Sequence, residues 1–304
     1  MYIPDTVARV ANQGWDARIL VCRCGPLVDT FIVVSERYVV LIDTLINRRT
    51  AEALLEIARE HLAGRQLLAV NTHADWDHAW GNHVFAGPSA LRPAPIIASW
   101  RCAERLRSEA AQHKLAELRA SAPGRFDNVA LTPPSVLFEQ RLAIDGGDLT
   151  LELFATPGHK PDHIAVFIPE IGTLLPGDAA ELPFPFVESA ATMPAMRDSL
   201  ARMAALNVET ALYCHAPVTS GPALLRQNMA YFDTIEQRCR AALARGVPNT
   251  PDEAADVETL VGFPFAEALP ADADVAALEG FYRPGHQAAI RAMLGHLTRN
   301  EGQA

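Results

Sequence analysis

The sequence has no long apolar run: nowhere in its 304 residues do about eighteen apolar residues follow one another, so we expect no membrane-spanning helix. Blocks of Lys and Arg are also missing, and the formal net charge at pH 7 is -10. Because affinity for nucleic acid depends mainly on cationic contacts with phosphates, we expect a small-molecule substrate, with neither nucleic acid nor membrane as partner. The first residues show neither a basic stretch before an apolar one nor a small-residue cleavage site, which favours a cytoplasmic protein.

Cysteine is scarce as well. The five cysteines are an odd number and form no CxxC motif, which favours reduced thiols over a framework of disulfides. Cys22 and Cys24 alternate along an apolar stretch typical of a strand, so both side chains point to one face of it. Packing is favoured over metal binding for this pair.

Apolar residues are abundant: 49% of the chain is hydrophobic and 20% is charged, enough for one large domain or two modest ones. Runs of β-branched and apolar residues alternate with segments of helical periodicity along both halves. The strands we expect are residues 19–21, 29–34, 38–42, 67–70, 95–98, 136–138, 141–144, 149–156, 164–168, 173–175 and 210–213. The helices we expect are residues 48–62, 102–120, 195–206, 223–245 and 274–297.

Two groups of strands with helices outside them predict a layered α/β architecture, in which loops at strand ends carry the ligands. The Gly-rich run at residues 145–148 has the composition of a hairpin turn and not of a phosphate-binding loop. The Pro-rich stretch 247–270 is the plausible linker. It gives a catalytic domain of residues 1–246 and a C-terminal helical extension of residues 247–304 packed on the same domain.

The segment THADWDHAWGNH, residues 72–83, holds three histidines and two aspartates directly after the apolar run 67–70. If the chain leaves a strand there in a tight loop, His73, Asp75, Asp77 and His78 converge on one point. Gathering such polar groups unpaired would be costly, and a divalent cation offsets that cost. A metal site is therefore favoured over the alternative, a polar loop that caps a helix.

Four further residues of ligand type stand where predicted strands end. They are Asp43 after YVVLI, His159 in ATPGH, Asp178 in LLPGD and His215 in LYCH. Because the same placement recurs four times, chance is a poor explanation for it. Loops at strand ends are where binding and catalytic residues concentrate, which groups these residues with the cluster.

With these motifs the sequence resembles the metallo-β-lactamase superfamily. The family pattern is an Asp after an early strand, His-x-His-x-Asp-His, a His after a strand, a bridging Asp and a final His. Order and approximate spacing match from Asp43 to His215, and TPGH followed by PGD is the most specific pairing. The resemblance implies an α/β protein with the four-layer αββα sandwich of the metallo-β-lactamase fold, with additional C-terminal helices.

The resemblance also implies a site with two divalent metal ions. His73, Asp75 and His159 would hold one ion, Asp77, His78 and His215 would hold the second, and Asp178 would bridge them. This makes seven residues of the chain metal ligands.

One position departs from the family pattern, because the second His of the motif is Asp75 here. A carboxylate is harder than imidazole, has a shorter reach, and adds a negative charge that lowers the Lewis acidity of the ion. Zinc is the expected metal, with Mn or Fe as alternatives because of Asp75. The flavodiiron branch carries Glu at this position and binds iron, but it needs a flavin domain for which this chain has no spare length.

Other residues near these motifs have several interpretations. Asp43 is better explained as accepting the remaining N–H of a ligating His than as a ligand. His163 could replace a missing ligand or line the pocket, and a hydrogen bond to its own loop is favoured. His83 is interpreted as structural. Cys214 would point away from the metal if its strand continues that far.

Two cations about 3.5 to 4 Å apart can share a water, lower its pKa toward neutrality and present hydroxide to an electrophilic centre. One ion would polarise the substrate oxygen and the other would stabilise the leaving group, while Asp77 or Asp178 shuttles a proton. We therefore expect a metallo-hydrolase acting on a small ester, lactone or thioester. Phe184 and Phe186, in segment 181–194, could form an apolar wall over the metals or pack under the next helix.

Three rival functions remain beside this one. A phosphodiesterase is an alternative within the family but is disfavoured by the acidic charge. A non-haem iron oxidoreductase similar to the persulfide dioxygenases would use a redox metal in place of two hydrolytic ones. A binding protein that kept the fold and lost catalysis is the least supported, because seven ligand-type positions are intact.

Overall fold

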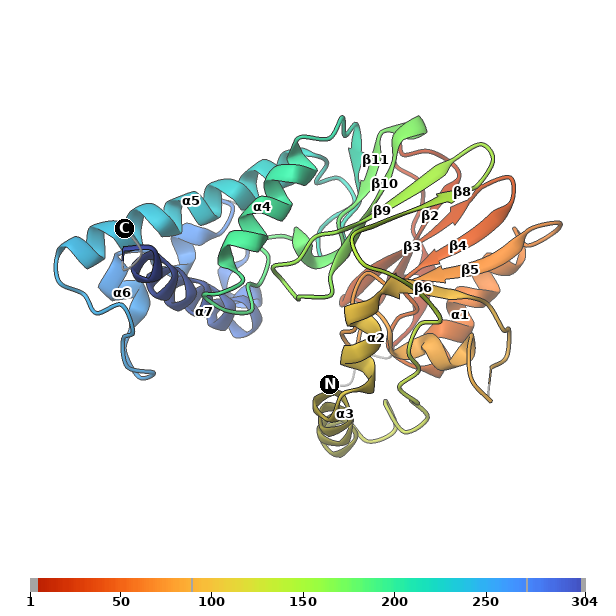
Figure 1. Cartoon of the computed structure of the whole chain (residues 1–304), viewed down its shortest axis with the longest axis horizontal. Coiled ribbons are helices and arrows are strands. Elements are labelled where there is room, and N and C mark those ends of the chain that lie inside the picture. The colour runs from red at the N-terminus through yellow and green to blue at the C-terminus, as the bar shows by residue number, and fades with distance from the viewer. Residues whose placement is uncertain (1–4, 89, 272, 302–304) are drawn as a thin grey trace. The chain divides into compact units, whose positions relative to one another are not determined.

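The computed structural model of the chain describes residues 5–88, 90–271 and 273–301 (Figure 1), and it forms two compact units. The first unit comprises Met1–Ala155, Asp162–Gly177 and Asn207–Thr219. The second comprises Thr156–Pro161, Asp178–Leu206 and Ser220–Ala304. The boundary expected at residue 246 stays a prediction.

The first unit contains both sheets that the described residues form. In the larger sheet the strands follow chain order, β1 (Val7–Arg9), β2 (Ile19–Cys24), β3 (Val28–Val34), β4 (Tyr38–Ile42), β5 (Gln66–Val70), β6 (Ile96–Ser99) and β7 (Val136–Phe138). The pairs from β1 to β4 are antiparallel, and those from β4 to β7 are parallel. β4 and β5 are joined by α1 (Arg48–Arg59), as parallel neighbours need a crossover.

The second sheet has the order β12, β11, β10, β9, β8. Its strands are β8 (Arg141–Asp145), β9 (Thr150–Ala155), β10 (Ile164–Ile168), β11 (Thr173–Leu175) and β12 (Thr210–Ala211). Apolar side chains of β9 and β10, such as Leu151 and Val166, join those of β3 and β4, such as Ile32 and Leu41, in one buried core. The two sheets thus pack face to face, which leaves their edges and connecting loops to carry polar residues.

Helices α1, α2 (Trp100–Arg107) and α3 (Glu109–Ser121) also belong to the first unit, with the 3-10 turns η1 (Trp80–Val84) and η2 (Pro169–Ile171). The single helix expected over residues 102–120 was wrong, because the chain breaks at Ser108. Ser108 has extended backbone angles of -69° and 154°, and its hydroxyl accepts a hydrogen bond from Ala111 N at 3.1 Å. A Ser cap of this kind starts a new helix, so two helices take the place of one.

The second unit is helical. It contains α4 (Met193–Ala204), α5 (Ala223–Ala244), α6 (Val257–Val261), the 3-10 turn η4 (Phe265–Ala268) and α7 (Val275–Glu301), and α7 packs on α4, α5 and α6. Phe184 is fully buried among the aromatic rings of this unit and stacks on Tyr231 with centroids 4.3 Å apart. The α/β class with C-terminal helices is confirmed, and no described helix is both long and apolar enough to cross a membrane.

Candidate metal centre

The loop after β5 carries four of the predicted ligands, and the sheet determines where it begins. β4 and β5 run parallel with Ile42 opposite Val70, so both strands end at the same edge. Beyond this edge Asp43 N donates to Val70 O at 2.7 Å, with a left-handed φ of 69° at Asp43. The loop then turns back on itself, because His78 N donates to Asp75 O at 3.1 Å. This turn lets side chains several positions apart approach one another.

Asp77, His78 and His215 form a group whose ligand atoms all lie within 4.8 Å of one another. Asp77 Oδ2 is 3.7 Å from His78 Nε2 and also 3.7 Å from His215 Nε2. These distances are too long for hydrogen bonds, and they suit ligands that each stand about 2.0–2.2 Å from one shared ion. The first unit therefore contains a candidate site with two imidazoles and one carboxylate.

His215 reaches this group although it is far from the loop in sequence. The strand expected over residues 210–213 is shorter than predicted, because β12 ends at Ala211. The chain then attaches to the start of β3, where Asp29 N donates to Cys214 O at 2.8 Å. His215 Nδ1 lies 2.9 Å from Leu27 O, so this nitrogen carries the proton and Nε2 is left as the ligand atom.

His73 and Asp75 form a second pair in the same loop. His73 Nε2 is 3.7 Å from Asp75 Oδ2, and the ring of His73 lies 4.2 Å from that of His78 between centroids. His73 is fully buried, whereas the Asp75 side chain is 25% exposed. Asp75 Oδ1 accepts a hydrogen bond from Arg105 Nη2 at 2.8 Å. Two of the three predicted first-site ligands are therefore adjacent, and Asp75 is also paired with the guanidinium of Arg105.

Asp43 lies behind the imidazoles. Its Oδ2 is 2.8 Å from His78 Nδ1 and accepts from Thr72 Oγ1 at 2.7 Å, while its Oδ1 accepts from Thr72 N at 2.7 Å. Thr72 Oγ1 in turn lies 3.0 Å from His73 Nδ1. Because the carboxylate only accepts, the Thr72 hydroxyl donates to it and is left to accept from His73 Nδ1–H. One buried carboxylate thus orients His78 directly and His73 through Thr72.

His159 and Asp178 belong to the second unit. There His159 Nε2 is 3.7 Å from Asp178 Oδ2, and His159 Nδ1 is 3.2 Å from Phe186 O. Gly158 has a φ of 147°, and a Cβ at this position would stand 2.4 Å from Met196 Cα, so the turn before His159 needs glycine. Asp178 lies in the 3-10 turn η3 (Gly177–Ala179). The distance from Nε2 to the carboxylate oxygen in this pair equals the 3.7 Å found among the predicted ligands of the first unit.

The donor set suits a divalent metal ion. In the four predicted His ligands, Nδ1 faces an oxygen of the protein and Nε2 faces a carboxylate at 3.7 Å. Metal-ligating imidazoles characteristically donate their second N–H to a carboxylate, a hydroxyl or a backbone carbonyl in this way. Imidazole donors suit Zn²⁺ and Fe²⁺ and carboxylate donors suit Mn²⁺, so the mixed donor set fits all three ions.

Two other histidines of the loops have different surroundings. His163 is buried, its ring is 5.0 Å from that of His73 between centroids, and its Nε2 is 2.6 Å from the place where a Cβ on Gly177 would stand. His83 lies in η1, where its Nδ1 is 3.0 Å from Trp80 O. Burial lowers the pKa of His83 below 6.5, which suits a neutral structural histidine.

The expectation for Cys214 depends on its strand continuing as far as residue 214. β12 stops at Ala211, so this condition is not met and the alternation of a strand does not apply at Cys214. Its Sγ lies within 4.8 Å of ligand-type atoms of Asp43 and His78.

Sequence reasoning missed Thr72, Arg105 and Asp162. Thr72 opens the motif but resembles any polar loop residue. Arg105 lies on a helix that looks uniformly amphipathic, and Asp162 stands three residues after His159 in a Pro-rich loop. None of them has the spacing of a ligand, so only the fold reveals what they contact.

Known proteins are similar to this chain in sequence and in fold. Residues 25–215 match the family model of the metallo-beta-lactamase superfamily. Hydroxyacylglutathione hydrolase of Hahella chejuensis is 28% identical over 65% of this chain and 67% of its own, and that of Maricaulis maris is 26% identical over 74% and 81%. A metallo-beta-lactamase family protein from Thermus thermophilus has a similar structure, with a TM-score of 0.60 and 22% identity over 90% of this chain and 89% of its own.

The chain belongs to the metallo-beta-lactamase superfamily, since the family model spans more than half of its length. The predicted fold is confirmed, and so is the enzyme class, a metal-dependent hydrolase of this superfamily. Members of this fold bind divalent metal ions, and the candidate ligand groups described above are of the kind that this requires.

Proposed function

We propose that this enzyme hydrolyses a small carbonyl substrate, an ester, lactone or thioester, and that a thioester is the best candidate. The group Asp77, His78 and His215 is the observation that carries the proposal, because its three ligand atoms converge while each imidazole is anchored through Nδ1. Among carbonyl substrates we favour a thioester, because two hydroxyacylglutathione hydrolases are 28% and 26% identical to this chain.

The proposed site holds two divalent ions, zinc first, with Mn or Fe as alternatives. One would be held by His73, Asp75 and His159, and the other by Asp77, His78 and His215, with Asp178 between them. The connectivity of the chain supports including His159 and Asp178 in the proposed site. His159 lies in a segment of which both chain neighbours, Ala155 and Asp162, belong to the first unit, and Asp178 directly follows Gly177 of that unit.

When bound, the ions would lower the pKa of water and polarise the carbonyl oxygen of the substrate. The residues of the chain would then do three things. Asp77 or Asp178 would pass a proton toward the leaving group. Asp43 would hold His78 and, through Thr72, His73 in the orientation that keeps Nε2 available. A thiolate is a good leaving group, so a thioester needs little protonation at this step.

An apolar surface beside His159 supports a small acyl group as the part of the substrate that is recognised. Phe186, whose carbonyl oxygen faces His159 Nδ1, stacks on Tyr282 with centroids 5.5 Å apart. It also meets the edge of Phe281, which is 65% exposed. Phe184 is fully buried, so Phe186 and Phe281 are the residues of this aromatic cluster that we propose to meet a ligand. His163, the other pocket candidate from the sequence, is buried as well.

The cellular setting we propose is the cytoplasm, with a small-molecule substrate and neither nucleic acid nor membrane as partner. The five cysteines are buried and form no disulfide among the described residues, which is compatible with a reducing compartment. Burial raises the pKa of Cys22 and Cys24 to about 12, so these thiols are poor nucleophiles and suit packing.

The experiment is a substrate panel run on metal-free protein reloaded with Zn, Mn or Fe. The panel contains an acyl thioester of glutathione, an aryl ester, a lactone and a phosphodiester, and oxygen consumption with a thiol persulfide is followed separately. We expect hydrolysis of the thioester to exceed that of the phosphodiester by at least about 100-fold in kcat/KM. Preferred phosphodiester cleavage, or oxygen uptake with one iron per chain, would replace the proposal with one of the alternatives.

A further inference from the structure

Asp75 is the position at which this chain departs from its family, and its two carboxylate oxygens face different partners. Oδ2 lies 3.7 Å from His73 Nε2, which is the ligand side. Oδ1 accepts a hydrogen bond from Arg105 Nη2 at 2.8 Å. A carboxylate can use one oxygen for an ion and the other for a guanidinium, so the two contacts are compatible.

Arg105 is itself fixed by a rigid surrounding. Its Nη1 pairs with Asp162 Oδ1, and the Asp162 side chain has no exposed surface. Asp162 is held in turn, because its Oδ2 accepts from Ala74 N at 2.8 Å and its backbone oxygen accepts from Ser99 Oγ at 2.7 Å. Ser99 caps α2, the helix that carries Arg105. Asp162, which contacts the guanidinium, is therefore fixed both to the metal loop and to the residue that caps the helix of Arg105.

Resting on the proposed function, we propose that Arg105 is a positioning residue for the first metal site. It holds Asp75 with Oδ2 directed at the ion. Its guanidinium is shared between Asp75 and Asp162, so it offsets part of the negative charge that Asp75 brings to the place where the family pattern has a neutral imidazole. This reduces the difficulty that a carboxylate raises here, namely an added negative charge that lowers the Lewis acidity of the ion.

A purely structural role for Arg105 is the competing explanation. The ion pairs with Asp75 and Asp162 also tie the metal loop to α2. Removal of Arg105 would leave the buried carboxylate of Asp162 without its cation, which costs stability. The two roles differ in what they predict for Asp75→His. If the role is structural, loss of Arg105 should lower metal affinity equally in the wild type and in the Asp75→His variant. If Arg105 is a positioning residue, its loss should lower metal affinity only when residue 75 is a carboxylate.

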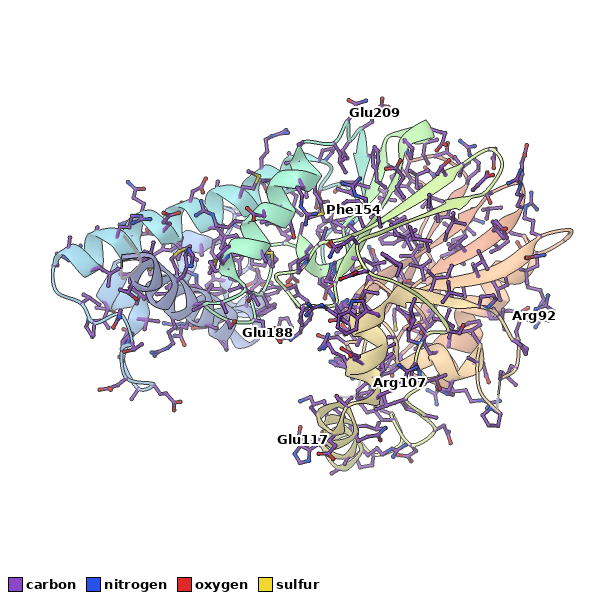
Figure 2. The ribbon with its side chains drawn as sticks, viewed as in Figure 1. Arg92, Arg107, Glu117, Phe154, Glu188 and Glu209 are labelled. Atoms are coloured by element: carbon purple, nitrogen blue, oxygen red, sulfur yellow. The ribbon has the colours of Figure 1, made fainter. Side chains whose placement is uncertain are left out.

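The test is a double-mutant cycle on metal affinity, with Arg105→Gln, Asp75→His and the double variant. Affinity for Zn and Mn is measured on metal-free protein by competition with a chromophoric chelator, with thermal unfolding recorded in parallel. Arg105→Lys is included because it keeps a cation beside Asp162 and so preserves folding. Arg107→Gln is the matched control, since Arg107 is exposed on the same helix (Figure 2).

We expect Arg105→Gln to weaken the first site about 10-fold or more, as loss of a residue that orients a metal ligand does, and Arg105→Lys to weaken it less. In the Asp75→His background the same change should leave zinc affinity unaltered or increase it, because no carboxylate remains to be held. The Arg107→Gln variant should match the wild type. Asp75→His alone should raise the affinity for Zn relative to that for Mn.

Three outcomes overturn the inference: unchanged affinity in Arg105→Gln, an equal loss in both backgrounds, or a wild-type protein that binds no metal. Its failure is distinguishable from failure of the proposed function. If the cycle shows the expected coupling but no carbonyl substrate is hydrolysed, only the function fails. If thioesters are hydrolysed but the cycle shows no coupling, only the role of Arg105 fails.

Discussion

Asp43 Oδ2 lies 2.8 Å from His78 Nδ1, and this hydrogen bond is made by a residue whose backbone has a φ of 69°. A left-handed conformation is costly for an aspartate, and it persists only where surrounding contacts impose it. Here the contacts are Val70 O, which accepts from Asp43 N, and Thr72, which donates twice to the carboxylate. The contacts that impose this unfavourable backbone conformation on Asp43 thus also place its carboxylate where it orients the imidazoles.

Asp43→Asn should lower kcat/KM or metal affinity by about 10- to 100-fold. In one orientation the amide NH2 would face the donor Thr72 N. In the other it would face the donors His78 Nδ1–H and Thr72 Oγ1–H, so a donor meets a donor in either orientation. The measurements are chelator competition for zinc and the rate of thioester hydrolysis. Asp252→Asn, at an exposed position of the second unit, is the control. A rate equal to that of wild type would mean that Asp43 only completes the strand end.

His78→Ala and His215→Ala should each remove one ion per chain and lower hydrolysis by more than about 100-fold. A site of three protein ligands loses its geometry when one imidazole is absent. Metal content by elemental analysis and steady-state rates are the measurements. His113→Ala, on an exposed turn of α3, should change neither. Full turnover with unchanged metal content in either site variant would contradict the ligand assignment.

Gly158→Ala should destabilise the fold by more than about 2 kcal/mol, because the new Cβ meets the backbone of Met196 and the φ of 147° is unfavourable for alanine. Gly124→Ala is the matched control: its φ of 86° is also positive, but no atom lies within 4 Å of the added Cβ. We expect the control to cost about 1–2 kcal/mol. Urea unfolding of both variants measures the difference, and equal costs would show that the Met196 contact yields without strain.

Acidification should destabilise the second unit through His286. Burial lowers the pKa of His286 below 6.5, and its nitrogens lie 3.0 Å from Tyr231 Oη and 2.9 Å from Phe263 O. The unfolded chain then binds a proton that the folded chain excludes, so stability falls as the pH drops through about 6.5 and below. His286→Gln should unfold more easily at neutral pH but lose part of this acid dependence. His113→Gln, on an exposed histidine, should keep the wild-type slope, and an unchanged slope in His286→Gln would refute the assignment.

The sequence predicted the elements whose signal is local. β4, β7, β10 and β11 have the predicted bounds, because each is an apolar run closed by a turn. The break at Ser108 was missed since helical periodicity continues through it, and only the cap shows it. β12 was overestimated because Leu212 and Tyr213 are apolar and buried without being in a strand.

For the candidate site, the sequence identified residue types and not the contacts between them. His73, Asp77 and His78 could be grouped because one loop carries them. The place of His215 depends on its anchor at Leu27, 188 residues away, which no spacing reveals. Arg105 is a similar case, because its partners Asp75 and Asp162 meet it only after α2 has packed beside both loops.

We propose that convergent imidazoles and carboxylates make this chain a metal-dependent hydrolase of carbonyl substrates. The most direct test of this proposal is a titration of metal-free protein with zinc while hydrolysis of a glutathione thioester is followed. We expect a rate close to background without metal, a rise that saturates at two ions per chain, and no rise in His78→Ala. Hydrolysis by the metal-free protein at the full rate, or a zinc-loaded wild type that leaves the thioester, the ester and the lactone intact, would contradict it.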